Sequence, residues 1–168
     1  MRMCGPIGFF VHHQGRGHAE RAAAIANELI GKRSVTLFCA KPDIFPELDT
    51  RIEVMKLPSL FEPTGSEAPA MASLAMPETV HCAPLGWPTI TDAFATVASW
   101  FAAPRPALFV TDVSAELGQL ARLCSIPHVA VMQHGERSDP GHMAAYDSVY
   151  NKIEWYRSSN DINSSTSK

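Results

Sequence analysis

Histidines and glycines are concentrated in one short segment of the chain, FFVHHQGRGHAER (residues 9–21). It holds His12, His13 and His18 together with Gly15 and Gly17. Histidine is the side chain that gains and loses a proton near neutral pH. Glycine lets a backbone turn tightly or approach a ligand closely. Such a segment is suited to holding a ligand against the backbone and moving a proton on it.

The chemistry that this segment favours is general base catalysis by His18. We expect His18 in the first turn of a helix, and Asp112 at the end of a neighbouring strand. A carboxylate on one imidazole nitrogen fixes the tautomer and leaves the other nitrogen free to accept a proton. A base of this kind acting on a hydroxyl contributes about 10²–10⁴ in rate. The alternative is a lone histidine in solvent at the start of the helix.

Two other kinds of site are weighed against this one. Gly15-x-Gly17 begins the dinucleotide-binding pattern, but the third glycine is replaced by Glu20, whose charge would lie where a pyrophosphate binds. A metal site formed by His13, His18 and Asp112 has no recognised ligand spacing. We therefore expect neither a cofactor nor a metal ion.

The elements that must position these residues follow an alternating pattern. Apolar runs predict five strands, and amphipathic segments with the spacing i, i+3, i+4, i+7 predict helices between them. This order predicts an α/β, Rossmann-like, doubly wound parallel sheet with helices on both faces. Ligands bind such sheets at the carboxyl ends of the strands. The strands are expected at residues 7–11, 34–40, 51–57, 107–111 and 128–132, and the helices from residue 19 and at 89–103, 114–125 and 140–153.

Two segments lie outside this alternation. Residues 58–88 contain six of the chain's thirteen prolines and no clear periodicity, which predicts a long loop insert. Residues 158–168 are rich in serine, which predicts a disordered tail after a domain spanning 1–157.

The composition argues against some classes of binding partner and indicates the setting of the protein. The net charge is −3 and the basic residues are not clustered, which argues against nucleic acid. No apolar run approaches the roughly 20 residues of a membrane span. The four cysteines form no CxxC pair, so we expect a reducing, cytoplasmic setting, with Cys39 and Cys124 as buried thiols.

The segment GFFVHHQGRGHAERAAAIANEL resembles the opening of glycosyltransferases that have the two-domain GT-B fold. LFVTDVSAELGQLARLCSIPHVAV resembles their later strand-Asp-helix-Pro-strand segment. QHGERSDPGHMAAYDSV is similar to a loop of the bacterial transferase that adds N-acetylglucosamine to lipid I. Together the matches cover residues 7–57 and 105–149, as expected for the N-terminal, acceptor-side domain of this group and of UDP-glycosyltransferases.

The resemblance implies a role for each matching residue. His18 matches the base that deprotonates the acceptor hydroxyl, and Asp112 matches the carboxylate that supports it. Substrate-binding positions are implied at Gly15, Gly17, Gln133, His134 and Glu136. His13, at the end of the first strand, and Arg16, whose charge could neutralise a phosphate, are added as substrate-binding candidates from the residues themselves.

The resemblance also implies a second domain that binds a UDP-sugar donor. We expect this chain to be a truncated or naturally separate half, inactive until a C-terminal domain or a partner chain supplies the donor site. A non-catalytic binding subunit and a sugar-nucleotide epimerase fragment are the alternatives. Peripheral membrane contact through residues 58–88 and self-association are left open.

Overall fold

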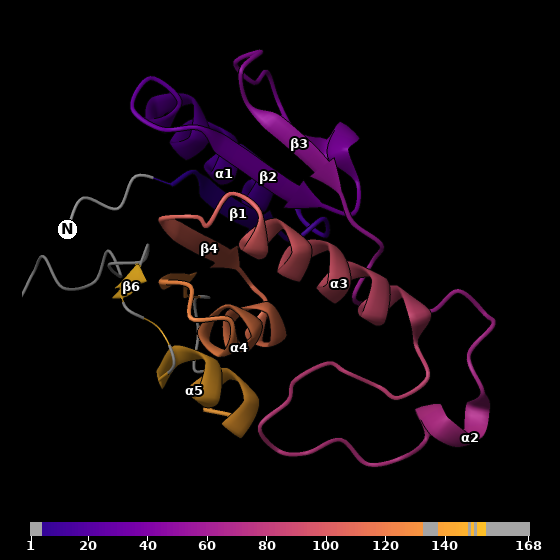
Figure 1. The fold of residues 1–168 in the computed structure, drawn as a ribbon. Coiled ribbons are helices and arrows are strands. Elements are labelled where there is room, and N and C mark those ends of the chain that lie inside the picture. The colour runs from indigo at the N-terminus through magenta and orange to yellow at the C-terminus, as the bar shows by residue number, and fades with distance from the viewer. Residues whose placement is uncertain (1–4, 133–137, 148, 150, 154–168) are drawn as a thin grey trace, which may run out of the picture.

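The strands form one parallel sheet at the centre of the molecule (Figure 1). The computed structural model describes residues 5–132, 138–147, 149 and 151–153. In the described residues the sheet has six strands in the order β3-β2-β1-β4-β5-β6, and each pairing is parallel. The strands are β1 (Ile7–Val11), β2 (Val35–Cys39), β3 (Glu53–Lys56), β4 (Leu108–Asp112), β5 (His128–Val131) and β6 (Asn151–Ile153).

Helices cover both faces of the sheet, which confirms the predicted doubly wound architecture. One core packs α1 (Arg16–Leu29) against the sheet through Ala22 and Ala26. The other packs α3 (Pro88–Ala102) and α4 (Ala115–Leu123) against the opposite face through Val97, Phe101 and Leu117. The remaining helices are α2 (Pro69–Ala72), α5 (Pro140–Asp147) and the 3-10 turn η1 (Pro42–Ile44). The strand order reverses between β1 and β4, so their carboxyl ends flank the expected crevice.

Three predictions from the sequence are wrong: the extent of the last helix, the burial of Met143 and the burial of Cys124. The last predicted helix was expected to extend to residue 153, but α5 ends at Asp147 and residues 151–153 pair with β5 as a sixth strand. Met143 shares the apolar spacing of that predicted helix but is 40% exposed. Cys39 is buried as predicted, whereas Cys124 is exposed because it is the residue that closes α4.

The insert (residues 58–88) contains little regular structure apart from α2, and it extends beyond the end of α3 (Figure 1). Its far end is fastened to α4. Glu116 accepts hydrogen bonds from the backbone N–H groups of His81 (2.7 Å) and Cys82 (2.6 Å). Gln119 donates to the carbonyl oxygen of Thr79 at 2.7 Å. Because Glu116 is buried, these bonds fix residues 79–82 beside α4.

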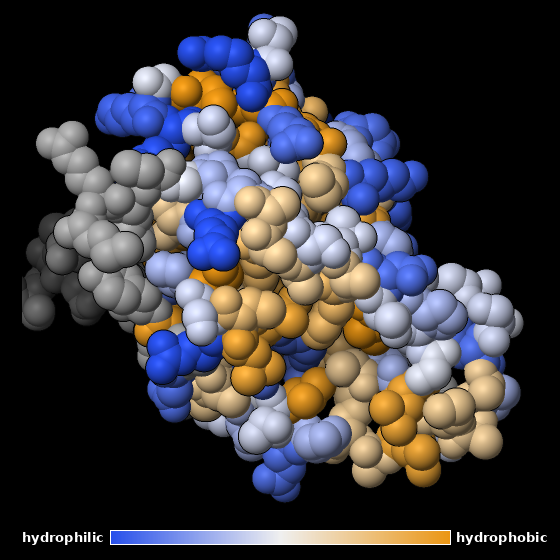
Figure 2. Space-filling view, viewed as in Figure 1, coloured by the Kyte–Doolittle hydropathy of each residue, from blue (hydrophilic) through white to orange (hydrophobic). Residues whose placement is uncertain are grey.

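The outer part of the insert is apolar at its surface. Figure 2 shows apolar side chains gathered around the region of α2. The exposed large apolar residues of the insert are Met71, Leu74, Met76 and Leu85. Within the described residues, no helix has the length and apolar character needed to cross a membrane. The predicted tail at 158–168 lies outside the described residues.

Candidate active site

The turn between β1 and α1 places His18 over the backbone of Gly15. Gly15 has φ +106° and precedes the first residue of α1, so His18 is the third helical residue. A Cβ added at Gly15 would lie 3.2 Å from Cδ2 of the His18 ring. Glycine is required here twice, for its positive φ and for the close approach of the imidazole.

The structure brings His18 and Asp112 together, as the sequence predicts. Asp112 is the last residue of β4 and lies opposite Val11 in the β1–β4 register. Its side chain is fully buried, and Oδ2 lies 3.0 Å from Nδ1 of His18, whose side chain is 26% exposed. Among the described residues, no hydrogen bond is made by Nε2 of His18. The dyad therefore presents one free ring nitrogen at the rim of the sheet.

A third residue, Arg21, completes the cluster and was not predicted as part of the site. Its Nη2 donates to both oxygens of Asp112, at 2.8 Å and 2.7 Å, and lies 3.2 Å from Nδ1 of His18. The i, i+3 spacing from His18 was the signal that both side chains share one face of the helix.

Arg21 also bears on the tautomer of His18. With a proton on Nδ1, His18 and Arg21 both donate to Asp112. With Nδ1 unprotonated, Arg21 donates to His18, but the imidazole then presents a lone pair to the Asp112 carboxylate. An ionised carboxylate can accept hydrogen bonds but cannot donate one. The proton on Nδ1 is therefore the better arrangement, and it leaves Nε2 as the acceptor.

His12 and His13 separate to different surroundings at the end of β1. The His12 ring stacks on Phe61 of the insert at 4.6 Å between centroids, and its centroid is 5.8 Å from that of His18. Nδ1 of His12 accepts the backbone N–H of Gln14 at 3.0 Å. Burial, and then the neighbouring His13 and His18, lower the pKa of His12 to about 4. His13 is buried, with Nε2 3.3 Å from Oε1 of Glu62.

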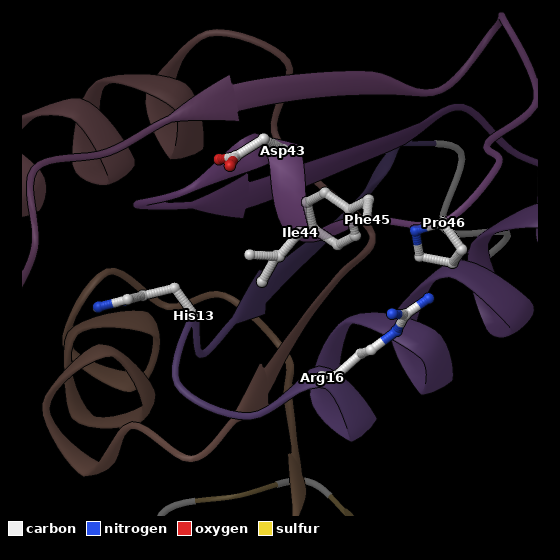
Figure 3. A pocket seen from close by; sticks show the side chains of 6 residues that line it. All are labelled: His13, Arg16, Asp43, Ile44, Phe45 and Pro46. Carbon is white, nitrogen blue, oxygen red and sulfur yellow. The ribbon is translucent and has the colours of Figure 1, made fainter.

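Two pockets adjoin this cluster. The first, which we call the Asp43 pocket, has a volume of about 300 Å³ and lies between the β1–α1 turn and the segment after β2 (Figure 3). Two predicted binding residues, His13 and Arg16, line it opposite Asp43 to Pro46. The Arg16 side chain is 82% exposed and its Nε donates to Glu20 at 2.9 Å. Gly17 faces open space, because a Cβ added there would have no heavy atom within 4 Å.

The second, the strand-end pocket, has a volume of about 270 Å³ and lies beyond the ends of β1 and β4. It is lined by His12, Gln14, Phe61, His81, Val113, Ser114, Ala115, Glu116 and His142. Val113, the residue after Asp112, has φ +63°. That conformation is an outlier for a β-branched residue, and backbone strain of this kind is typical of functional sites.

The other predicted residues fall into two groups. Gln133, His134 and Glu136 lie outside the described residues. His81, His128 and His142, which were not predicted as site residues, each have a polar partner. Nε2 of His128 lies 2.7 Å from Oγ1 of Thr111, and burial lowers the pKa of His128 to about 4. Asp139 is the partner of His142 at 2.8 Å and of His81 at 3.9 Å.

Comparison with solved structures identifies the fold. MurG from Acinetobacter baumannii matches with a TM-score of 0.53 and 11% sequence identity, over 87% of this chain and 39% of MurG. A UDP-glucosyltransferase from Polygonum tinctorium that glucosylates indoxyl matches with a TM-score of 0.50 and 22% identity, over 80% of this chain and 31% of that one. The chain has the fold of the N-terminal domain of GT-B glycosyltransferases.

The chain spans well under half the length of the solved proteins it resembles. No family model matches the sequence, and no curated protein matches it. At these identities the likeness is one of fold. It places β1, α1, β4 and α4 in the framework that the sequence predicted, and the role of each side chain has to be argued from the site itself.

Proposed function

We propose that this GT-B domain is the acceptor-binding half of a nucleotide-sugar-dependent glycosyltransferase, with His18 as the general base. The observation that carries the proposal is the 3.0 Å contact between Nδ1 of His18 and the buried Asp112 carboxylate. It occurs where the strand order reverses, which is the position where ligands bind in open parallel sheets.

The geometry supports separate roles for Asp112, His18 and the residues around them. Asp112 holds the imidazole with its proton on Nδ1, so that Nε2 can accept the proton of an acceptor hydroxyl. The hydroxyl oxygen then bonds to the anomeric carbon of the sugar as the bond from that carbon to the nucleoside diphosphate breaks, and the diphosphate leaves with the electron pair. The imidazolium that forms is stabilised by the adjacent carboxylate. Substrate-positioning roles fall to His13 and Gly15 in the turn before α1 and to Arg16 and Gly17 at the start of α1. Gln133, His134 and Glu136, which lie outside the described residues, are proposed to share this role.

Arg21 supplies the competing explanation for Asp112. A buried carboxylate bound by an arginine is also a structural ion pair, and such pairs need no catalytic role. The two explanations differ at His18: a structural pair tolerates its removal, whereas a general base does not. The free Nε2 and the partial exposure of the ring favour the catalytic role.

The donor site is proposed to lie outside this domain. The matched segment makes up well under half of MurG and of the Polygonum enzyme, and the donor contacts that stabilise charge in the transition state would come from the rest of the enzyme. We therefore propose that a UDP-sugar reaches His18 only when a donor-binding half, on the same polypeptide or on a partner chain, closes over the strand ends.

The test assays sugar transfer with the donor-binding half present. His18→Ala and Asp112→Asn are each expected to lower kcat by at least about 10² while the fold survives. Glu28→Gln, an exposed change on the same helix, is the matched control and should keep full activity. Full activity in His18→Ala would refute the base. Sugar transfer by the isolated 168-residue chain would refute the need for a donor half.

A non-catalytic binding subunit predicts a different pattern. It needs no base, so His18→Ala would leave ligand affinity unchanged and no variant would change turnover. Product analysis separates a transferase from an epimerase, because an epimerase returns a nucleotide-sugar and needs no acceptor.

A further inference from the structure

A second group of titratable side chains lies apart from the His18 dyad, where the insert meets α5. It consists of His81 from the insert, Asp139 immediately before α5, and His142 in the first turn of α5. Each offers one ligand atom, and these atoms all lie within 4.8 Å of one another. Among the residues that the structure describes, this is the one trio of its kind. We propose that His81, Asp139 and His142 bind a divalent first-row transition metal ion.

The separations are close to those of a coordination shell. A tetrahedral zinc ion with bonds of about 2.1 Å holds its ligand atoms about 3.4 Å apart. With Oδ1 as the Asp139 ligand atom, Nδ1 of His142 lies 2.9 Å from it and Nδ1 of His81 lies 3.9 Å from it. An ion would lengthen the first separation and shorten the second by about half an ångström each. The side chains of His81 and Asp139 are both exposed, which leaves them room to rotate.

The backbone beneath the ligands is held firmly. Glu116 accepts hydrogen bonds from the backbone N–H groups of His81 and Cys82, so the backbone at His81 is held in place. Asp139 accepts the backbone N–H of His142 at 3.1 Å, which caps α5. A Cβ at Gly141 would lie 2.9 Å from the backbone nitrogen of His81, so only glycine lets the two segments approach this closely. The local Asp139–His142 pair explains two of the ligands without a metal, but it does not explain the third.

The ligand set indicates the class of ion. Two imidazoles and one carboxylate suit zinc, iron, cobalt and nickel, rather than magnesium or calcium, which prefer oxygen ligands. Three protein ligands leave a coordination position for water or another ligand. Because His81 and His142 both line the strand-end pocket, that position is open to whatever the pocket binds. The proposal departs from the expectation of no metal site, and it does not depend on the proposed sugar transfer.

The experiment measures Zn²⁺ binding to the metal-free 168-residue chain by isothermal titration calorimetry. We expect one zinc ion per chain, and a rise in Tm of about 5 °C or more at a hundredfold excess over Kd. Co²⁺ should compete for the same site and give the visible absorption of a low-coordinate cobalt ion.

Two variants keep the local structure while removing a ligand. Asp139→Asn retains the helix cap, since asparagine caps as well as aspartate, and His81→Gln retains the backbone bond to Glu116. Each should weaken zinc binding at least tenfold without changing the Tm of the metal-free protein. His13→Gln controls for zinc bound by the histidines near His18 and should bind like the wild type. Absence of binding, binding retained in both ligand variants, or binding lost only in His13→Gln would each overturn the proposal.

Discussion

The contact between Arg21 and Asp112 makes a quantitative prediction about stability. Asp112 is fully buried, and one arginine nitrogen donates to both of its oxygens, at 2.8 Å and 2.7 Å. Removing one partner of a buried ion pair costs about 3–5 kcal/mol, because the other charge stays buried. Arg21 is 28% exposed, so we expect Arg21→Met to fall at the lower end, about 3 kcal/mol. For a chain of this length that loss corresponds to a fall in Tm of about 6–12 °C.

The assay is urea unfolding followed by circular dichroism at neutral pH, with a double-mutant cycle. Arg21→Met and Asp112→Asn together should cost less than the sum of the two single changes by at least about 1.5 kcal/mol, because the double variant buries no unpaired charge. Arg16→Met is the matched control. Arg16 lies on the same helix, is 82% exposed and, among the described residues, forms an ion pair with Glu20 alone, so this change should cost less than about 0.5 kcal/mol. A loss below that value for Arg21→Met, or additive single changes, would refute the reasoning.

Two further predictions concern a buried histidine and the glycines of the site. Burial lowers the pKa of His128 to about 4. The unfolded chain therefore binds a proton at this histidine below about pH 6.5, whereas the native chain binds it only near pH 4. The free energy of unfolding should fall as the pH is lowered from about 6.5 to about 4. Urea unfolding at pH 4.5 and 7.5 should show a smaller fall in His128→Gln than in the wild type, and equal falls would contradict the assignment. Gly15→Ala should lower the free energy of unfolding by at least about 1 kcal/mol, because its φ is positive and its Cβ would meet His18. Gly17→Ala, which meets no heavy atom within 4 Å, should stay within about 0.5 kcal/mol of the wild type or stabilise the helix, and equal losses at both positions would count against the described turn.

The sheet and the His18–Asp112 dyad could be predicted from the sequence, because both follow from local residue patterns. Buried strands such as residues 7–11 are continuous apolar runs, and parallel topology brings their carboxyl ends to one edge. That argument alone placed Asp112 near His18. Arg21 was missed although its i, i+3 spacing from His18 places it on the same face of the helix, because an arginine at a helix start is equally typical of a solvated position. The strand pairing of residues 151–153 was missed because three residues carry no periodicity that separates a strand from the end of a helix.

The histidines outside the dyad show where such reasoning stops. His81 belongs to a segment without periodicity, so only the tertiary bonds of Glu116 reveal that it lies beside His142. Cys124 was expected to be buried because it continues the apolar face of α4, but the helix closes at that residue and turns the thiol outward. The position of His81 depends on tertiary hydrogen bonds, and the exposure of Cys124 depends on where α4 ends. Local residue patterns specify neither.

The fastening of residues 79–82 to α4 divides the insert into a fixed stem and an outer loop. Substitutions or insertions around α2 can alter the loop's length and apolar surface while Glu116 and Gln119 keep the stem in register with the strand ends. The loop can therefore vary in sequence without displacing the stem residue His81, which lines the strand-end pocket.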